Sequence, residues 1–337
     1  MRERDYNLEL IRIASCVMVI VIHVSNYYCR AFGRISAGEY GFSLFLNTFA
    51  RVSVPCFFMI SGALLLGREE TIEKHKKRIW RFLTATLVWS LIYYVHNVCY
   101  MKTPVDLDEV IQTPTEPHLW YLYAMIPIYI VLPFLQAMFR GLDERLERLL
   151  LVGGFLVVTV GYLLSLRGEG LYYDVPLFAD RGYSYYFFAG YILYKCKESP
   201  AVNTRCLSGI FLGSSLANMA LTAYISVQSG DHYERLLEYG CPLTILAGAS
   251  FFLLLLRAWD GNVHLQEAGK KRIDRISGCS FGIYLIHILF LDSYKKHFKA
   301  WDFPAYLIIP VLTAGLLAVS FGCVYLLRRT KAGRKIT

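Results

Sequence analysis

One apolar stretch decides the class of this protein: residues 8–26, which read LELIRIASCVMVIVIHVSN. The apolar run around it, about residues 8–28, matches the ~20 residues that a helix needs to cross the hydrocarbon core of a bilayer. It is too long for the core of a signal peptide, and no small-residue cleavage site follows it. We therefore expect this stretch to remain in the mature protein as a membrane helix.

Similar runs recur along the chain. Of the 337 residues, 55% are hydrophobic and 18% charged, whereas a soluble domain has about 45–50% and about 25%. This composition excludes a soluble globule, a disordered chain and a coiled coil. We predict an all-α fold: a polytopic membrane protein, one domain over residues 1–337, with about ten transmembrane helices. The expected spans are 8–28, 42–66, 79–100, 118–139, 147–166, 183–196, 204–227, 237–258, 277–294 and 303–327. The sixth span could instead dip into the bilayer or lie along its surface.

The basic residues indicate an orientation. Most of the 35 Lys and Arg residues fall in segments on the same side as the N-terminus, and such segments normally face the cytoplasm. We therefore predict that both termini are cytoplasmic, which an even number of spans also requires. The net charge of +9 follows from these loops, and we expect no nucleic-acid partner.

The cysteines and histidines predict no metal site. The nine cysteines include no C-x-x-C pair and their number is odd, so neither a disulfide framework nor a zinc site is indicated. The histidines lack the H-x-x-x-H spacing of helical metal ligands. We expect most of these thiols to be buried apolar groups.

Two ionisable residues, Arg12 and His23, lie within the first predicted span. Each costs about 2.5–3.5 kcal/mol on insertion scales, so each invites a functional interpretation. Eleven residues correspond to ~1100° of helical rotation, which places both side chains on one face, ~16 Å apart. Glu9 lies one turn before Arg12 and can pair with it. In the plainer interpretation, Arg12 extends to the membrane interface and His23 is a structural residue. In the functional interpretation, Arg12 binds phosphate and His23 is a general base.

Five blocks of sequence resemble the acyltransferase-3 family of bacterial membrane acyltransferases. They are Arg12-x10-His23 with Glu9 before it, the segment RVSVPCFFMISG at residues 51–62, KRIWR at 77–81, HLWYLY at 118–123 and SFGIYLIH at 280–287. The forms RVSVP and HLWYLY most resemble the branch that contains the enterobacterial common antigen O-acetyltransferase. The blocks follow the family's order and extend over most of the chain.

This resemblance implies an enzyme of the bacterial inner membrane. It would transfer an acetyl or short acyl group from cytoplasmic acetyl-CoA to a hydroxyl of a cell-envelope carbohydrate or lipid-linked glycan, with membrane lipid around it. The resemblance implies catalytic roles for His23, Arg12 and Glu9. We assign donor binding to Arg12, Arg78, Arg81, Arg51 and Ser61, and acceptor binding to His118, Trp120, Tyr121, Tyr284 and His287. Acceptor specificity is expected in loops 101–117 and 167–182. A homo-oligomer is left open.

Other interpretations stay open. The basic cluster at 76–81 also fits a cytoplasmic helix flank. Arg51 also fits a structural ion pair with an outer-face carboxylate, and Ser61 a helix contact. Trp120 and Tyr121 also fit an aromatic belt, and the ninth-span residues Tyr284 and His287 fit helix–helix hydrogen bonding. A transporter or exporter is the rival function, and a membrane sensor without chemistry is the second rival.

Overall fold

The computed structural model describes residues 4–103, 113–171, 175, 177–178, 182–199, 203–258 and 265–337. In these parts of the chain it contains helices and no strands. The α-helices are α1 (Tyr6–Cys29), α2 (Ala37–Ala50), α3 (Ser53–Leu65), α4 (Ile72–Val95), α5 (Trp120–Arg140), α6 (Glu144–Leu166), α7 (Tyr183–Lys195), α8 (Thr204–Ser229), α9 (Pro242–Ala258), α11 (Glu267–His297), α12 (Ala305–Leu327) and α13 (Gly333–Ile336). The short turns are η1 (His96–Met101), which is π-helical, and the 3₁₀ turns η2 (Pro117–Leu119) and η3 (Arg235–Leu237).

The number of candidate spans differs from the prediction. In the described residues, nine helical segments are long and apolar enough to cross a membrane, not ten. The sixth predicted span, 183–196, corresponds to α7, which has only 13 residues. Such a helix is ~20 Å long and falls short of a ~30 Å hydrocarbon core. Both arguments for cytoplasmic termini, the even number of spans and the side of each basic segment, assumed ten spans, so the location of the termini stays a prediction.

The second predicted span, 42–66, is not continuous. It divides into α2 and α3 at Arg51 and Val52. Pro55 explains the division, because it cannot donate a hydrogen bond to the carbonyl of Arg51 and its ring crowds that group. The start of α2 is also fixed locally by a capping box in which Ser36 and Glu39 satisfy each other's backbone N–H groups. The division places Arg51 at the end of a helix.

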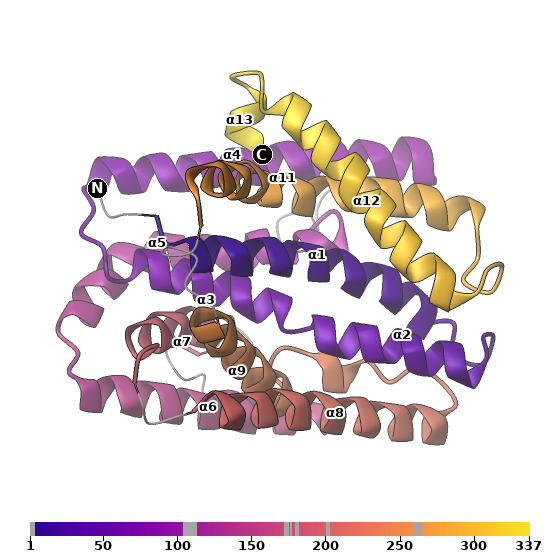
Figure 1. Ribbon diagram of the computed structural model, residues 1–337, viewed down its shortest axis with the longest axis horizontal. Helices are drawn as coiled ribbons and strands as arrows, with labels where there is room; N and C mark the ends of the chain where they lie inside the picture. Colours follow the sequence, from indigo (N-terminus) through magenta and orange to yellow (C-terminus); the bar gives the residue numbers. More distant parts are fainter. Residues whose placement is uncertain are drawn as a thin grey trace.

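Helix α1 is enclosed by the rest of the bundle. Figure 1 shows it in the middle of the molecule, with α4, α11 and α12 on one side and α2, α3, α7 and α9 on the other. It contacts α2, α3, α9, α11 and α12. Peripheral α6 and α8 lie along one edge (Figure 1). The helix that carries Arg12 and His23 is therefore shielded from lipid by its neighbours.

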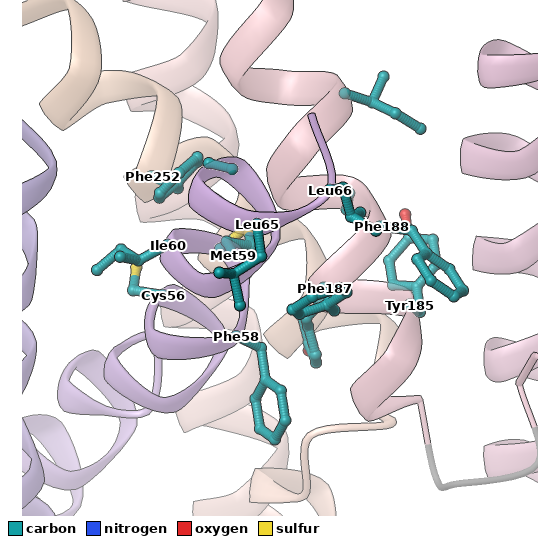
Figure 2. Close-up of a cluster of buried hydrophobic side chains, with 14 of the residues drawn as sticks. Cys56, Phe58, Met59, Ile60, Leu65, Leu66, Tyr185, Phe187, Phe188 and Phe252 are labelled. Atoms are coloured by element: carbon teal, nitrogen blue, oxygen red, sulfur yellow. The ribbon is translucent and has the colours of Figure 1, made fainter. Parts of the chain in front are cut away.

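Helices α3 and α7 pack closely through glycine. In Figure 2, Phe58 and Met59 of α3 lie beside Phe187 of α7, and Leu66 lies beside Phe188. A Cβ at Gly62 would lie 1.7 Å from the carbonyl oxygen of Phe187, and a Cβ at Gly190 would lie 2.2 Å from that of Met59. Small residues allow backbones to approach in this way inside membranes, so a short α7 is held firmly against α3.

We predict that Gly62→Ala destabilises the protein by about 1–3 kcal/mol, because the added methyl group displaces the α7 backbone. Thermal unfolding of the purified protein in detergent measures the effect. Gly153→Ala in α6 is the matched control, since a Cβ there meets no atom within 4 Å. Equal unfolding temperatures for the two variants would contradict the prediction.

Candidate active site

A cavity of about 620 Å³ lies inside the bundle, alongside α1. Along this helix it is lined by Arg12, His23 and Arg30, among others. Arg12 and Arg30 are 18 positions apart, which corresponds to a helical rise of ~27 Å, close to the thickness of a bilayer core. The cavity thus follows nearly the whole depth of the first span, with an arginine at each end and the histidine between them.

At one end, Arg12 is held by Glu9. Nη1 of Arg12 donates to Oε2 of Glu9 over 2.9 Å, which is the i,i+3 pair expected from the sequence. The buried Glu9 carboxylate also accepts from Arg4 over 3.1 Å and from the Ser277 hydroxyl. Glu9 does not line the cavity. Its contacts fix the direction of the Arg12 guanidinium, whose side chain remains 26% exposed.

Three imidazole rings gather near the middle of the cavity, and two of them, those of His23 and His118, line it. The ring centre of His23 is 5.2 Å from that of His287 in α11 and 6.3 Å from that of His118 in η2. The rings of His118 and His287 are 5.6 Å apart. Among the described residues, no group of three or more His, Cys, Asp or Glu side chains is placed to hold a metal ion.

His287 and Tyr284 take different places. Tyr284 lines the cavity and its hydroxyl donates to the carbonyl oxygen of His118, which ties α11 to η2. His287 is completely buried and does not line the cavity. Acceptor binding was predicted for both residues, but only Tyr284 reaches the cavity, because i and i+3 positions differ by about 60° around a helix.

At the other end, Arg51 meets the carboxylate of Glu234. Nη2 of Arg51 lies 3.3 Å from Oε1 of Glu234, and Arg30 donates to Oε2 over 2.8 Å. Asn26 donates to Oε1 as well, over 3.0 Å. Burial acts to raise the pKa of Glu234, but Arg51 and Arg30 outweigh it and hold that pKa below its usual value. Arg51 therefore has the carboxylate partner that the structural interpretation required, and it also lines the cavity.

Sequence reasoning missed Glu234. It lies 183 positions after Arg51, in the segment before η3. An acidic residue in a short polar segment was the only available signal. Glu116 was missed too, although it stands two residues before the recognised His118. Burial raises the pKa of Glu116, and Asn97 donates to its carboxylate over 3.1 Å. Both carboxylates line the cavity, as does Lys295.

Aromatic side chains form one wall of the cavity. Its aromatic residues include Trp120, Tyr121 and Tyr239, and Ser61 of α3 also lines the cavity. The Trp120 ring lies 4.7 Å from that of Tyr183 and 5.5 Å from that of Tyr239. The Ser61 hydroxyl donates to the Phe57 carbonyl within α3 over 2.9 Å, so it must rotate before it can donate to a ligand.

A second cavity of about 760 Å³ adjoins the first. It extends between α6, α7 and η3. Five residues line both cavities, and these are Arg30, Arg51, Trp120, Glu234 and Tyr239. The ion pair of Arg51 with Glu234 therefore stands between the two spaces.

The structure places the predicted arginines of α4 outside the cavity. Arg78 pairs with Glu70 at 2.5 Å. Nη2 of Arg81 donates to the carbonyl oxygen of Arg334 over 3.1 Å and lies 3.5 Å from that of Thr337. The guanidinium of Arg81 is thus engaged by the backbone around α13, and its assignment to donor binding stays a prediction.

Parts of the two loops expected to set acceptor specificity, 101–117 and 167–182, lie outside the described residues. These parts are 104–112, 172–174, 176 and 179–181.

Comparison with known proteins agrees with the sequence blocks. A family model described as an acyltransferase domain matches residues 5–329. A protein of Staphylococcus aureus strain MRSA252, named "Probable poly-beta-1,6-N-acetyl-D-glucosamine export protein", is 21% identical over 350 residues, which cover 97% of this chain and 94% of the relative. Its namesake in strain MSSA476 is 20% identical with the same coverage. No solved structure gives a significant match. Because the family model covers nearly the whole chain, this multi-pass membrane protein belongs to the acyltransferase-3 family.

Proposed function

We propose that this protein transfers an acetyl or short acyl group from acyl-CoA to a hydroxyl of a cell-envelope carbohydrate, and that His23 is the catalytic base. One observation supports the proposal above all others. His23 faces a cavity that follows α1 from Arg12 to Arg30, so a donor and an acceptor can reach one imidazole from opposite ends.

The Arg12 end suits the acyl donor. Its guanidinium is a planar fork of donors that matches phosphate or a polarised thioester oxygen. Glu9 holds it over 2.9 Å, so little conformational freedom is lost when a ligand binds. The basic residues near this end favour the cytoplasm, where acyl-CoA is found. Arg78 and Arg81 contribute to this end only as part of its positive charge.

The chemistry at His23 requires one proton transfer and one acyl transfer. The imidazole takes the proton of the acceptor hydroxyl, and the oxygen attacks the thioester carbonyl carbon. The carbon–sulfur bond then breaks, and the imidazolium returns its proton to the departing thiolate. In the alternative route a His23 nitrogen attacks the thioester carbon and the thiolate leaves with a proton; the acceptor hydroxyl then attacks the acyl-imidazole, the C–N bond breaks, and the hydroxyl proton stays on the imidazole until it is passed on.

The Arg30 end suits a carbohydrate. Arg51, Arg30 and Glu234 provide donors and acceptors for hydroxyl groups, and Trp120 and Tyr121 provide flat apolar surface. The Staphylococcus aureus relatives carry the name of a poly-N-acetylglucosamine export protein, which supports a polysaccharide as the class of acceptor.

Export of a carbohydrate is the second candidate function. Two observations favour it: the names of these relatives and the division of the second span at Arg51. Discontinuous helices often form the binding sites of transporters. An exporter would move its cargo without cleaving acyl-CoA.

Loss of His23 tests the proposed function. We expect His23→Ala to lower acetyl transfer from radiolabelled acetyl-CoA by about 10²–10⁴-fold, the usual contribution of a general base. The measurement uses purified wild-type and variant protein with cell-envelope glycans as acceptor. His297→Ala, at an exposed position, is the control and should transfer at the wild-type rate. Equal transfer by His23→Ala, or none by the wild type, would favour the exporter.

The Arg12 end has its own test. Arg12→Lys keeps the charge but removes the planar fork, so we expect KM for acetyl-CoA to rise about 10-fold. Acetyl-CoA titrations of the transfer rate give KM. Arg148→Lys is matched to it, because Arg148 also pairs with a glutamate on its own helix but is exposed. A change of equal size in both variants would argue against donor binding by Arg12.

A further inference from the structure

The buried imidazole of His287 is anchored to its own helix. Its Nδ1 lies 2.7 Å from the carbonyl oxygen of Tyr284 and 3.1 Å from that of Ile283. Carbonyl oxygens only accept hydrogen bonds, so Nδ1 must carry a proton. In the neutral ring, Nε2 then keeps its lone pair and can only accept.

Nε2 has no hydrogen-bond partner among the residues that the structure describes. His287 is completely buried, and an unsatisfied buried acceptor is costly. The ring of His23 is the nearest imidazole, at 5.2 Å between centres with the planes inclined by 52°. The structure contains no hydrogen bond between the two rings. Ring nitrogens extend ~1 Å from their centres, so a rotation of the His23 ring that points one nitrogen at Nε2 would bring the two nitrogens to ~3 Å, a hydrogen-bond distance.

We propose that His287 is a positioning residue, whose Nε2 accepts a hydrogen bond from one ring nitrogen of His23 and so leaves the other nitrogen unprotonated toward the cavity. The proposal rests on the proposed role of His23 and adds what orients it. A proton taken from the acceptor hydroxyl then binds the nitrogen that faces the cavity and is the one returned to the thiolate. His287 itself neither gains nor loses a proton.

A neutral histidine suits this place better than a carboxylate. Catalytic histidines in water-soluble enzymes are commonly oriented by an aspartate. Inside a membrane bundle an ionised carboxylate would add a desolvation cost, whereas an imidazole anchored by two carbonyls accepts the same hydrogen bond without charge. His118, at 5.6 Å from His287, closes the other side of the cluster.

Two substitutions of similar volume separate positioning from packing. His287→Met fills the space but offers only a weak sulfur acceptor, whereas His287→Gln carries an amide oxygen near the position of Nε2. We expect His287→Met to lower kcat by about 10–100-fold with KM for acetyl-CoA unchanged, as loss of an orienting partner does at other sites. His287→Gln should keep most of the wild-type kcat. A packing role predicts the reverse order, because Met suits an apolar core better than Gln.

A chemical probe reads His23 independently of acyl transfer. Diethyl pyrocarbonate modifies unprotonated imidazole nitrogens, and mass spectrometry of peptides gives the rate at His23 relative to the exposed His297. One neutral hydrogen bond supplies about a 3- to 10-fold bias toward the tautomer with its free nitrogen at the cavity. Loss of that bias leaves about half of the rings in this form, so we expect the relative rate to fall by about a third to a half in His287→Met and to stay near wild type in His287→Gln.

The outcomes are distinct. An unchanged rate of His23 modification in His287→Met overturns the positioning role. Equal losses of kcat in His287→Met and His287→Gln, with a lower unfolding temperature in both, overturn it as well. If the wild type transfers no acetyl group, the proposed function fails, but the order of His23 modification in the three proteins still decides whether His287 orients it.

Discussion

The cost of placing charge in hydrocarbon governs this structure. A guanidinium and an imidazole on the first helix can exist inside a bilayer only where other helices replace the lipid and provide polar partners. The bundle satisfies this constraint by packing five helices against α1 and by leaving a cavity along the face that carries Arg12 and His23. The cavity is thus the means by which two polar groups are tolerated, and the same space gives them access to ligands.

Enclosure of α1 depends on close packing further out. The backbones of α3 and α7 meet through Gly62 and Gly190, which lets a helix of 13 residues take part in a bundle of longer ones. The division between α2 and α3 then directs Arg51 toward the cavity instead of along a continuous helix. A proline and two glycines therefore shape the site without lining the cavity.

Local geometry explains which features the sequence could predict. The shared face of Arg12 and His23 and the pair of Arg12 with Glu9 follow from helical periodicity over a few turns, and the structure contains both. The helical class and most spans follow from hydropathy in the same way. Periodicity carries no information about the contact of Arg51 with Glu234, which joins segments 183 positions apart. The short α7 was counted as a span because its apolar composition, not its length, dominated the pattern. The contact of Arg81 with the backbone around α13 could not be predicted either, because a backbone carbonyl has no charge to reveal it.

Arg12 and Arg51 line opposite ends of the cavity, and their counter-charges differ in kind. Glu9 belongs to the same helix as Arg12 and its side chain is only 7% exposed, whereas Glu234 belongs to the segment before η3 and is 34% exposed. A buried partner on the same helix holds a guanidinium in one direction before any ligand arrives. A more exposed partner, shared with Arg30 and set between two cavities, competes less strongly with the hydroxyl groups of an incoming ligand. Within the proposed function, this difference suits a fixed site for a donor of constant structure at the Arg12 end. The weaker hold on Arg51 suits an adaptable site for a larger, more variable acceptor at the Arg30 end.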